Sequence, residues 1–236
     1  MNGNYNDIID VILTFNKDEE ISKSIVVSGS IVPYLVINKE SLEHHTDFYF
    51  LVKSKNLNSI RKKVKKLSKV YQFDVIIDSK NYSSFDCGFK IKYNDTVIGF
   101  FPYSIIDNSF TIKTFSISND RKEIKLKTKT IPNVSKNSII RLINFGGNTI
   151  RIMSPEFILA DKESRENQPG NPTVETMKLL NKLSDETVLE VLRKSVGEIV
   201  VKIDSKSLRR KNYILKILIF ILLLLFILIA YICFKK

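Results

Sequence analysis

The sequence predicts a mixed α/β (α+β) domain, a sheet flanked by helices, followed by one C-terminal transmembrane helix. Helical and β-branched segments alternate in the first third of the chain, a series of strand-like segments follows Tyr71, and the chain closes on a long apolar stretch. We expect three parts: residues 1–195 as one cytosolic domain, 196–212 as a basic linker and 213–236 as a membrane anchor.

The apolar stretch at 217–234 contains no charge, proline or glycine. A helix of that length rises about 27 Å, close to the ~30 Å hydrocarbon core of a bilayer. The N-terminus has acids within its short apolar run and no small-residue cleavage site, so no signal peptide is expected. We therefore expect a single-pass, tail-anchored protein whose N-terminal domain faces the cytoplasm. The basic residues flanking the span support this orientation: Arg209, Arg210, Lys211 and Lys216 before it, Lys235 and Lys236 after it.

The 236-residue chain is basic, with 37 Lys and Arg against 25 Asp and Glu and a net charge of +12. Such a balance favours an anionic partner, whether a membrane surface, a nucleotide or a nucleic acid. Cys87 and Cys233 lie in the soluble part and in the span, so no disulfide framework or cysteine metal site is expected. Adjacent histidines at 44 and 45 do not suggest a zinc site.

The first elements follow from apolar spacing. Residues 7–15 have helical spacing, and 25–30 form a β-branched run broken by a glycine. A tight turn and a helix with a proline near its start follow. Residues 47–53 predict a second strand, and 56–69 predict an amphipathic helix.

The second half predicts a meander and then helices. Strands are expected in the runs FDVIID, FDCGFKIKY, TVIGFFPYSII and SFTIKTFSI, with a hairpin turn at Asn94 and Asp95. The lysine-rich stretch 119–137 predicts a surface connection or an irregular edge strand. A strand then leads into a helix capped by Ser154, followed by a loop at 166–172 and helices at 173–183 and 185–194. These residue ranges and letters are read from the sequence.

One group of residues suggests a site for phosphate and Mg²⁺. Ser28-Gly29-Ser30 follows a strand, and Asp47 lies on the next strand. A glycine-serine turn that opens a helix can hold a phosphate with backbone N–H groups, and a nearby acid can bind Mg²⁺. The alternative is an ordinary turn and a surface acid, which occur in most proteins.

The segment VVSGSIVPYLVINKESLEHHTDFYFLV resembles the opening of the nucleotidyltransferase fold, in its minimal and AbiEii-like bacterial branch. IRIMSPEFILADK resembles the strand, Ser-Pro-Glu and helix lysine that follow in that family, and the likeness spans residues 24–183. The resemblance implies a nucleotidyltransferase-like fold with Gly29, Ser30 and Lys162 at the phosphates of a nucleoside triphosphate, and Asp47 as a ligand of Mg²⁺.

The resemblance also implies two acids two residues apart on one strand, which hold the metal together, and a third on a later strand. This sequence has Tyr49 in the second place, and the run TVIGFFPY contains no acid. Asp86 is an alternative third acid from a neighbouring strand. No catalytic residue is assigned, and the pattern predicts a degenerate member that has lost transfer activity.

The expected helix at 56–69 is basic on its outer face. An anionic membrane or RNA phosphates could bind there, and the lipid needs fewer assumptions because the chain carries its own anchor and no aromatic-basic RNA motif. The alternative is a solvated face. The basic residues are Arg61, Lys62, Lys63, Lys65, Lys66 and Lys69.

Three functional hypotheses follow. The first is a membrane-tethered, catalytically degenerate nucleotidyltransferase-like protein that binds a nucleotide or a partner. The second is an active enzyme that moves a nucleotidyl group from a triphosphate onto a protein, an RNA or a small molecule, with Asp47 and an unrecognised acid as ligands. The third is a membrane-anchored adaptor in which the fold is a scaffold.

Overall fold

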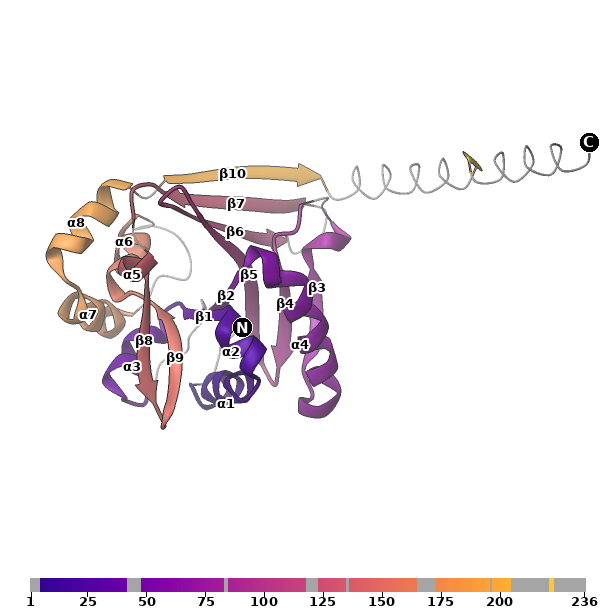
Figure 1. The fold of residues 1–236 in the computed structure, drawn as a ribbon, viewed down its shortest axis with the longest axis horizontal. Coiled ribbons are helices and arrows are strands. Elements are labelled where there is room, and N and C mark those ends of the chain that lie inside the picture. Colours follow the sequence, from indigo (N-terminus) through magenta and orange to yellow (C-terminus); the bar gives the residue numbers. More distant parts are fainter. Residues whose placement is uncertain are drawn as a thin grey trace, which may run out of the picture.

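The computed structural model describes residues 5–41, 48–82, 85–117, 123–134, 136–164, 173–195, 197–204 and 221–222. Within these ranges the chain forms one mixed sheet flanked by helices (Figure 1). The α-helices are α1 (Tyr5–Asn16), α2 (Glu19–Ser24), α3 (Val32–Ile37), α4 (Leu57–Tyr71), α5 (Lys136–Ile139), α6 (Pro155–Glu163), α7 (Val174–Leu183) and α8 (Glu186–Ser195). Two short 3-10 helices are η1 (Ser54–Asn56) and η2 (Ser79–Asn81).

The sheet runs in the order β10-β7-β6-β5-β2-β1-β9-β8, and β4 and β3 branch from the edge of β5 that also pairs with β6. The pairs β1–β9 and β2–β5 are parallel and the others are antiparallel. The strands are β1 (Ile25–Ser28), β2 (Tyr49–Lys53), β3 (Asp74–Asp78), β4 (Phe89–Tyr93), β5 (Thr96–Ile106), β6 (Ser109–Ile117), β7 (Glu123–Ile131), β8 (Ile140–Phe145), β9 (Asn148–Met153) and β10 (Gly197–Asp204).

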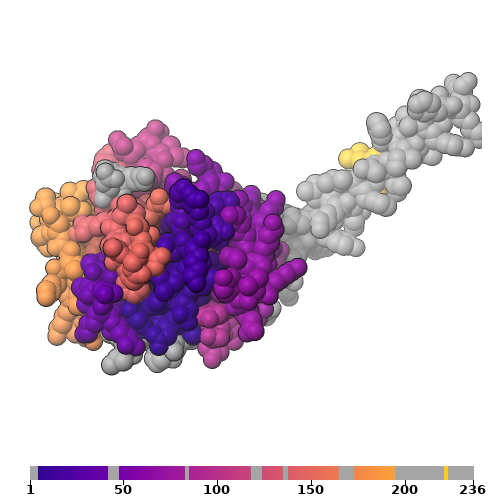
Figure 2. All heavy atoms as spheres, turned by 60° about the horizontal axis from the view of Figure 1, so that its bottom comes forward, coloured from indigo at the N-terminus to yellow at the C-terminus, as the bar shows by residue number. Residues whose placement is uncertain are grey.

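One face of the sheet is packed with aromatic side chains beneath α1 and α4. Phe15 of α1 meets Phe50 of β2 and Phe100 of β5, with ring centroids 5.5 Å apart in each pair. Phe100 in turn stacks on Phe89 of β4 at 4.6 Å. Figure 2 shows the N-terminal helices in the middle of one side of the molecule, so α1 closes the core. These contacts fix strands β2, β5 and β4 side by side, because each ring loses its packing if one strand shifts.

Most of the predicted elements are confirmed. The amphipathic segment at 7–15 lies in α1, the segment at 56–69 forms α4, and TVIGFFPYSII and SFTIKTFSI are β5 and β6. The hairpin at Asn94 is present, and Asn94 has a φ of +50° as a tight turn requires. The expected loop at 166–172 lies outside the described residues.

Three strands differ from the expectation. The lysine-rich stretch at 119–137 contains β7, which pairs on both sides, with β6 and β10, and is neither irregular nor an edge strand. Residues 197–204 form β10 in the sheet, although a linker was expected to begin at 196. Strand β8 was not predicted, and it joins β9 through the turn at Gly146 and Gly147. In β7, alternation of apolar residues such as Ile124 and Leu126 outweighs the lysines between them.

Among the described residues, no helix is both long enough and apolar enough to cross a membrane. The anchor predicted at 213–236 lies outside those residues, except for Ile221 and Leu222, which are helical. The anchor therefore stays a prediction.

Candidate functional site

The candidate site begins at the turn after β1. Gly29 has a φ of +101°, a conformation that favours glycine, and its carbonyl accepts a hydrogen bond of 3.1 Å from the N–H of Val32. This bond reverses the chain from β1 into α3, with Pro33 in the first turn of the helix. Ser30 is buried, at 4% exposure, and α3 has only six residues. The predicted turn is thus present, but its helix is too short for a strong dipole.

Four residues form a row across one face of the sheet, which we call the site face. Ser28 of β1 pairs with Tyr49 of β2, Tyr49 pairs with Gly99 of β5, and Gly99 pairs with Lys90 of β4. Directly paired residues point to the same side of a sheet, so the side chains of this row share a face, opposite the aromatic core under α1. The site face therefore starts beside the Gly29 turn and ends at Lys90.

Ser28 is fully buried, and its hydroxyl oxygen has no hydrogen-bond partner among the described residues. Buried polar atoms are nearly always paired, because leaving one unpaired costs roughly 1–3 kcal/mol. An unpaired hydroxyl next to the Gly29 turn is a point where a ligand atom could bind.

The place beside Tyr49 on β5 holds no acid. It is occupied by Gly99, and a Cβ there would lie 2.4 Å from the ring of Phe101. Phe101 is 7% exposed and is packed against the rings of Tyr49, at 5.6 Å, and Phe115, at 5.9 Å. The aromatic ring thus fills the space that a carboxylate side chain at 99 would need.

The donor groups of the described site face do not fit a two-metal centre. Tyr49 offers a phenol, Gly99 offers no side chain, and Lys90 is a cation. Among the described ranges, no group of three or more His, Cys, Asp or Glu residues could hold a metal ion. Asp47, the predicted ligand, lies outside the described residues, as do His44 and His45.

Lys90 was not singled out from the sequence. Its ammonium nitrogen lies 5.5 Å from the centroid of the Phe115 ring, and burial lowers its pKa. The only sequence signal is its alternation with Phe89 and Ile91, which predicts a side chain opposite the core. Which strand lies beside it could not be predicted, because that depends on the order of the strands.

The Ser-Pro-Glu segment has a structural role. Ser154 caps α6 by accepting a 3.2 Å bond from the N–H of Phe157. Glu156 is fully buried, and its Oε1 accepts bonds from Arg141 Nη2, at 2.7 Å, and from the N–H of Asp185, at 2.8 Å. Glu156 therefore ties α6 to β8 and to the start of α8.

Lys162 lies in the last turn of α6 and is 7% exposed. Its neighbour Asp161 forms a buried ion pair with Lys129 of β7. The structure thus places Lys162 inside the domain rather than on an open surface, and its contact with phosphates stays a prediction.

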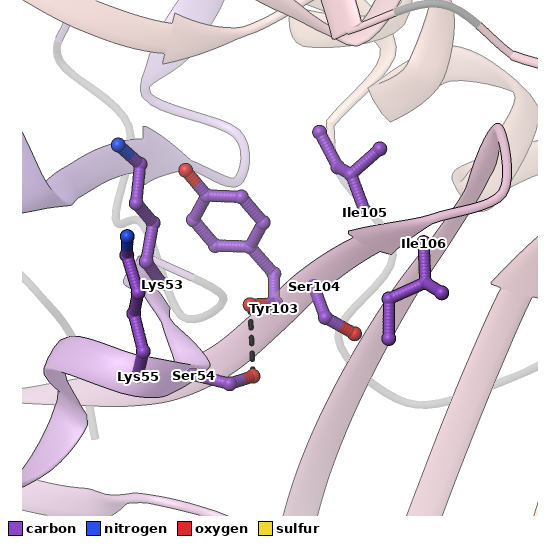
Figure 3. Close-up of a pocket in the computed structure, with 7 residues that line it drawn as sticks. All are labelled: Lys53, Ser54, Lys55, Tyr103, Ser104, Ile105 and Ile106. Atoms are coloured by element: carbon purple, nitrogen blue, oxygen red, sulfur yellow. Dashed lines mark hydrogen bonds between the residues drawn. The ribbon is translucent and has the colours of Figure 1, made fainter.

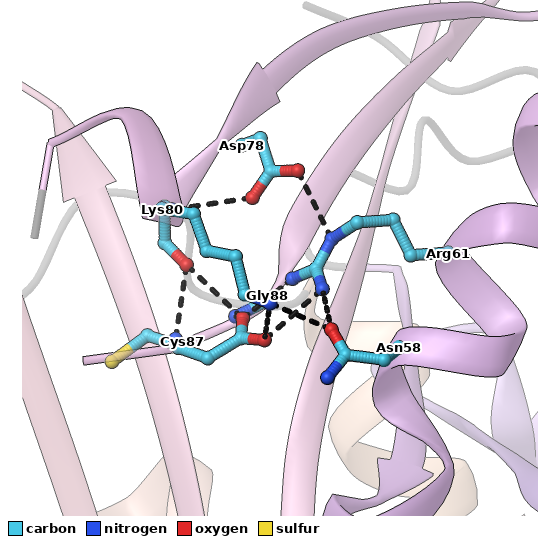
Figure 4. A network of polar contacts seen from close by, with 8 residues as sticks. Asn58, Arg61, Asp78, Lys80, Cys87 and Gly88 are labelled. Atoms are coloured by element: carbon cyan, nitrogen blue, oxygen red, sulfur yellow. Dashed lines mark hydrogen bonds and ion pairs between the residues drawn. The ribbon is translucent and has the colours of Figure 1, made fainter. Parts of the chain in front are cut away.

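The basic helix is α4, but it is not uniformly a surface for anions. Arg61 is 6% exposed and points into the molecule, where its Nε lies 3.0 Å from Asp78 and its other nitrogens bind Asp86 (Figure 4). Its guanidinium also lies over the ring of Phe89, 5.3 Å from the centroid. Arg61 is therefore a structural cation. Asp86, considered as a third acid, is held in this cluster.

Burial alone would raise the pKa of Asp86, but the bonds and charge of Arg61, with the N–H of Gly88 and the ammonium of Lys80, hold that pKa below its usual value. Lys63 binds Asp18 and Glu20 of the α2 region, at 2.9 and 2.8 Å.

The exposed basic residues of α4 are Lys62, Lys65, Lys66 and Lys69.

A pocket lies at the other end of β2 and β5 from the site face (Figure 3). Its volume is about 520 Å³, and the Ser54 hydroxyl donates a 2.8 Å bond to the carbonyl of Tyr103 in its wall. Burial raises the pKa of Tyr103 to about 12, although the nearby charge of Arg151 opposes the shift. Tyr49 and Lys53 are the two ends of β2, so the pocket is separate from the row. It is lined by Lys53, Ser54, Lys55, Tyr103, Ser104, Ile105 and Ile106.

The structure was compared with solved structures, and the sequence with family models and curated proteins. No family model and no curated protein matches the sequence. The solution structure of the antibiotic-resistance factor ANT(2'')-Ia matches with a TM-score of 0.50 and 16% identity, over 89% of this chain and 93% of that chain. The lincosamide antibiotic adenylyltransferase LnuA, bound to lincomycin, matches with a TM-score of 0.46 and 13% identity, over 78% of this chain and 100% of its own. An antigenic nucleotidyltransferase-like protein from Paracoccidioides brasiliensis reaches 0.44 and 12%, over 78% and 79%. The first likeness shows that this chain has the nucleotidyltransferase fold.

Proposed function

We propose that this protein is a membrane-tethered, nucleotidyltransferase-like protein of the AbiEii-like branch that binds a nucleoside triphosphate without transferring its nucleotidyl group efficiently. The fold supports the nucleotidyltransferase-like part of the proposal, and the apolar stretch at 217–234 is the reason for proposing the tether. One observation supports inefficient transfer: the position beside Tyr49 on β5 is Gly99, and the Phe101 ring occupies the space above it.

Inefficient transfer is expected because the reaction needs its developing charge to be stabilised. A nucleotidyl transfer develops charge on the phosphate oxygens, and paired metal ions held by carboxylates normally stabilise it. Here Tyr49 is a poor ligand for Mg²⁺, which prefers carboxylate and carbonyl oxygens. Of the acids implied by the resemblance, Asp47 alone remains at a matching position. One carboxylate is not enough to hold two cations in place.

Binding of a nucleotide requires fewer functional groups than transfer of its nucleotidyl group. The turn at Gly29 has no side chain that would keep a ligand from the backbone, and beside it Ser28 offers a hydroxyl that is unpaired among the described residues. These groups can bind a phosphate oxygen even where the metal acids are missing.

The test measures binding and transfer separately. Calorimetry of the full chain in detergent micelles with Mg²⁺ and each nucleoside triphosphate is expected to show binding of at least one. Incubation with the α-labelled nucleotide and protein, RNA or small-molecule acceptors is expected to leave the label untransferred. Asp47→Ala tests the remaining acid, and Asp95→Ala, in the exposed β4–β5 turn, is the matched control.

Two outcomes contradict the proposal. Transfer of label that Asp47→Ala abolishes and Asp95→Ala leaves intact would establish the active enzyme. If none of the four nucleotides binds, both nucleotide hypotheses are wrong and the adaptor hypothesis is favoured.

A further inference from the structure

The ammonium of Lys90 is a partly buried charge with no carboxylate partner among the described residues. It lies on the site face of β4, partly buried, and its contact among the described residues is the Phe115 ring. No acid in the described ranges forms an ion pair with it. Its neighbour Lys92, two residues along the same face, is paired with Asp95 at 3.3 Å.

Burying a cation costs free energy unless an anion or several acceptors compensate for the water that it loses. An aromatic face compensates for only part of that cost. Burial lowers the pKa of Lys90, in the direction expected for a cation that is incompletely compensated. An anionic ligand placed against this ammonium would remove the penalty, so the site favours such a ligand.

The opposite end of the row has a second group, the Ser28 hydroxyl, that has no partner in the described part of the chain. Ser28 and Lys90 are three strands apart, at the ends of the sequence Ser28, Tyr49, Gly99 and Lys90. At about 4.8 Å per strand this places their backbones roughly 14 Å from one another. A polyphosphate chain together with an extended lysine side chain can bridge that distance. Between them the ring of Phe101 lies over Gly99, so a polyphosphate that reaches both groups would pass over that ring.

We propose that Lys90 is the phosphate-binding cation of this site, acting in the place of the metal ion, so that the protein binds the polyphosphate of a nucleotide without a divalent cation. The inference rests on the proposed function, because it names what holds the phosphates in the same site. It explains why a site without its metal acids can keep its ligand: a fixed ammonium supplies positive charge that needs no carboxylates around it.

The experiment uses the full chain in detergent micelles, titrated calorimetrically with ATP and with inorganic tripolyphosphate, in Mg²⁺ and in EDTA. The dissociation constant of wild type is expected to change by less than about threefold between the two conditions. Lys90→Met is expected to weaken binding of both ligands by about 10- to 100-fold, the usual loss for a charge-assisted contact. Lys90→Arg is expected to retain most of the affinity. Lys92→Met, on the same strand and face, is the matched control and is expected to bind as wild type does.

A thermal-shift measurement guards against a folding artefact. Lys90→Met removes an uncompensated charge, so its melting temperature without ligand is expected to equal or exceed that of wild type. The stabilisation by tripolyphosphate is expected to disappear in Lys90→Met and persist in Lys90→Arg. If Lys90→Met does not fold, loss of that stabilisation in Lys90→Arg would count against the inference, and its retention would support it.

The two proposals fail in different ways. Binding that requires Mg²⁺ and is unchanged in Lys90→Met would overturn the role of Lys90 and leave nucleotide binding standing. Absence of ATP binding in every condition would overturn both.

Discussion

The ring of Phe101 lies directly over Gly99, so close that a Cβ at residue 99 would be 2.4 Å from it. Real Cβ atoms do not approach other atoms so closely, and the ring is held by Tyr49 and Phe115 on either side. Glycine is therefore required at 99 by packing, and Gly99 and Phe101 constrain one another.

This relationship predicts the behaviour of Gly99→Ala. The methyl group must displace a buried ring, so we expect the free energy of unfolding to fall by about 1–3 kcal/mol. Urea unfolding followed by circular dichroism measures it. The double variant Gly99→Ala with Phe101→Leu is expected to lose less than the sum of the two single variants. Additive losses would show that the ring does not press on residue 99.

Arg61 and Lys65 lie one helical turn apart on α4, and we expect their substitution to affect stability very differently. Arg61→Met leaves Asp78 and Asp86 without their cation inside the protein, so we expect a loss of about 3–5 kcal/mol of unfolding free energy. Lys65→Met, at an exposed position, is expected to change it by less than about 0.5 kcal/mol. Equal effects of the two substitutions in chemical unfolding would contradict the buried role of Arg61.

Asp86 makes stability depend on pH. Its pKa is lowered in the folded protein, so the unfolded chain binds the proton more readily as acid is added. The stabilisation is complete above the unfolded pKa, near 3.9, and is lost as the pH falls through the lower folded value. Asp86→Asn is expected to melt at a lower temperature than wild type at pH 7, and the difference is expected to shrink from pH 5 to pH 3. A difference that grows with acid would reverse the sign of the linkage.

The hydrogen bonds of Glu156 connect α6 with β8 and α8, and we expect their loss to lower the free energy of unfolding. Glu156→Ala removes the acceptor of Arg141 and of the Asp185 N–H, so we expect a loss of about 1–3 kcal/mol in urea unfolding. Glu175→Ala is the control, because its pair with Lys39 is exposed and is expected to contribute less than about 1 kcal/mol. If Glu156→Ala were as stable as Glu175→Ala, the tie would be unimportant.

The predicted anchor is tested by fractionation. The full chain is expected in the membrane pellet and resistant to alkaline carbonate, whereas a chain ending at residue 212 is expected in the supernatant at high salt. At low salt the shortened chain is expected to bind vesicles containing anionic lipid, and Lys65→Glu with Lys66→Glu is expected to reduce that binding. Full-length protein in the carbonate supernatant would rule out the span.

Local pattern predicted much of the fold. The hairpin at Asn94 and the amphipathic helices α1 and α4 follow from spacing and turn chemistry within a few residues, which the sequence displays directly. Strand β7 was expected only as a surface connection or an irregular edge strand, because its lysines disguise a period-two pattern. Its place between β6 and β10 depends on a segment far along the chain. Arg61 lies one turn after Leu57, beside the apolar stripe of α4, and its charge suggested a surface position; the approach of Asp78 and Asp86 pairs that charge inside the protein.

Residues close together in the chain were enough to predict the mixed α/β class, the Ser28-Gly29-Ser30 turn, the absence of an acid at 49 and the apolar stretch that suggests an anchor. Which residues share the site face depends on contacts between distant segments. Tyr49, Gly99 and Lys90 belong to three strands, and their alignment follows from strand order and register, which arise from the packing of Phe15, Phe50, Phe100 and Phe89 on the other side of the sheet.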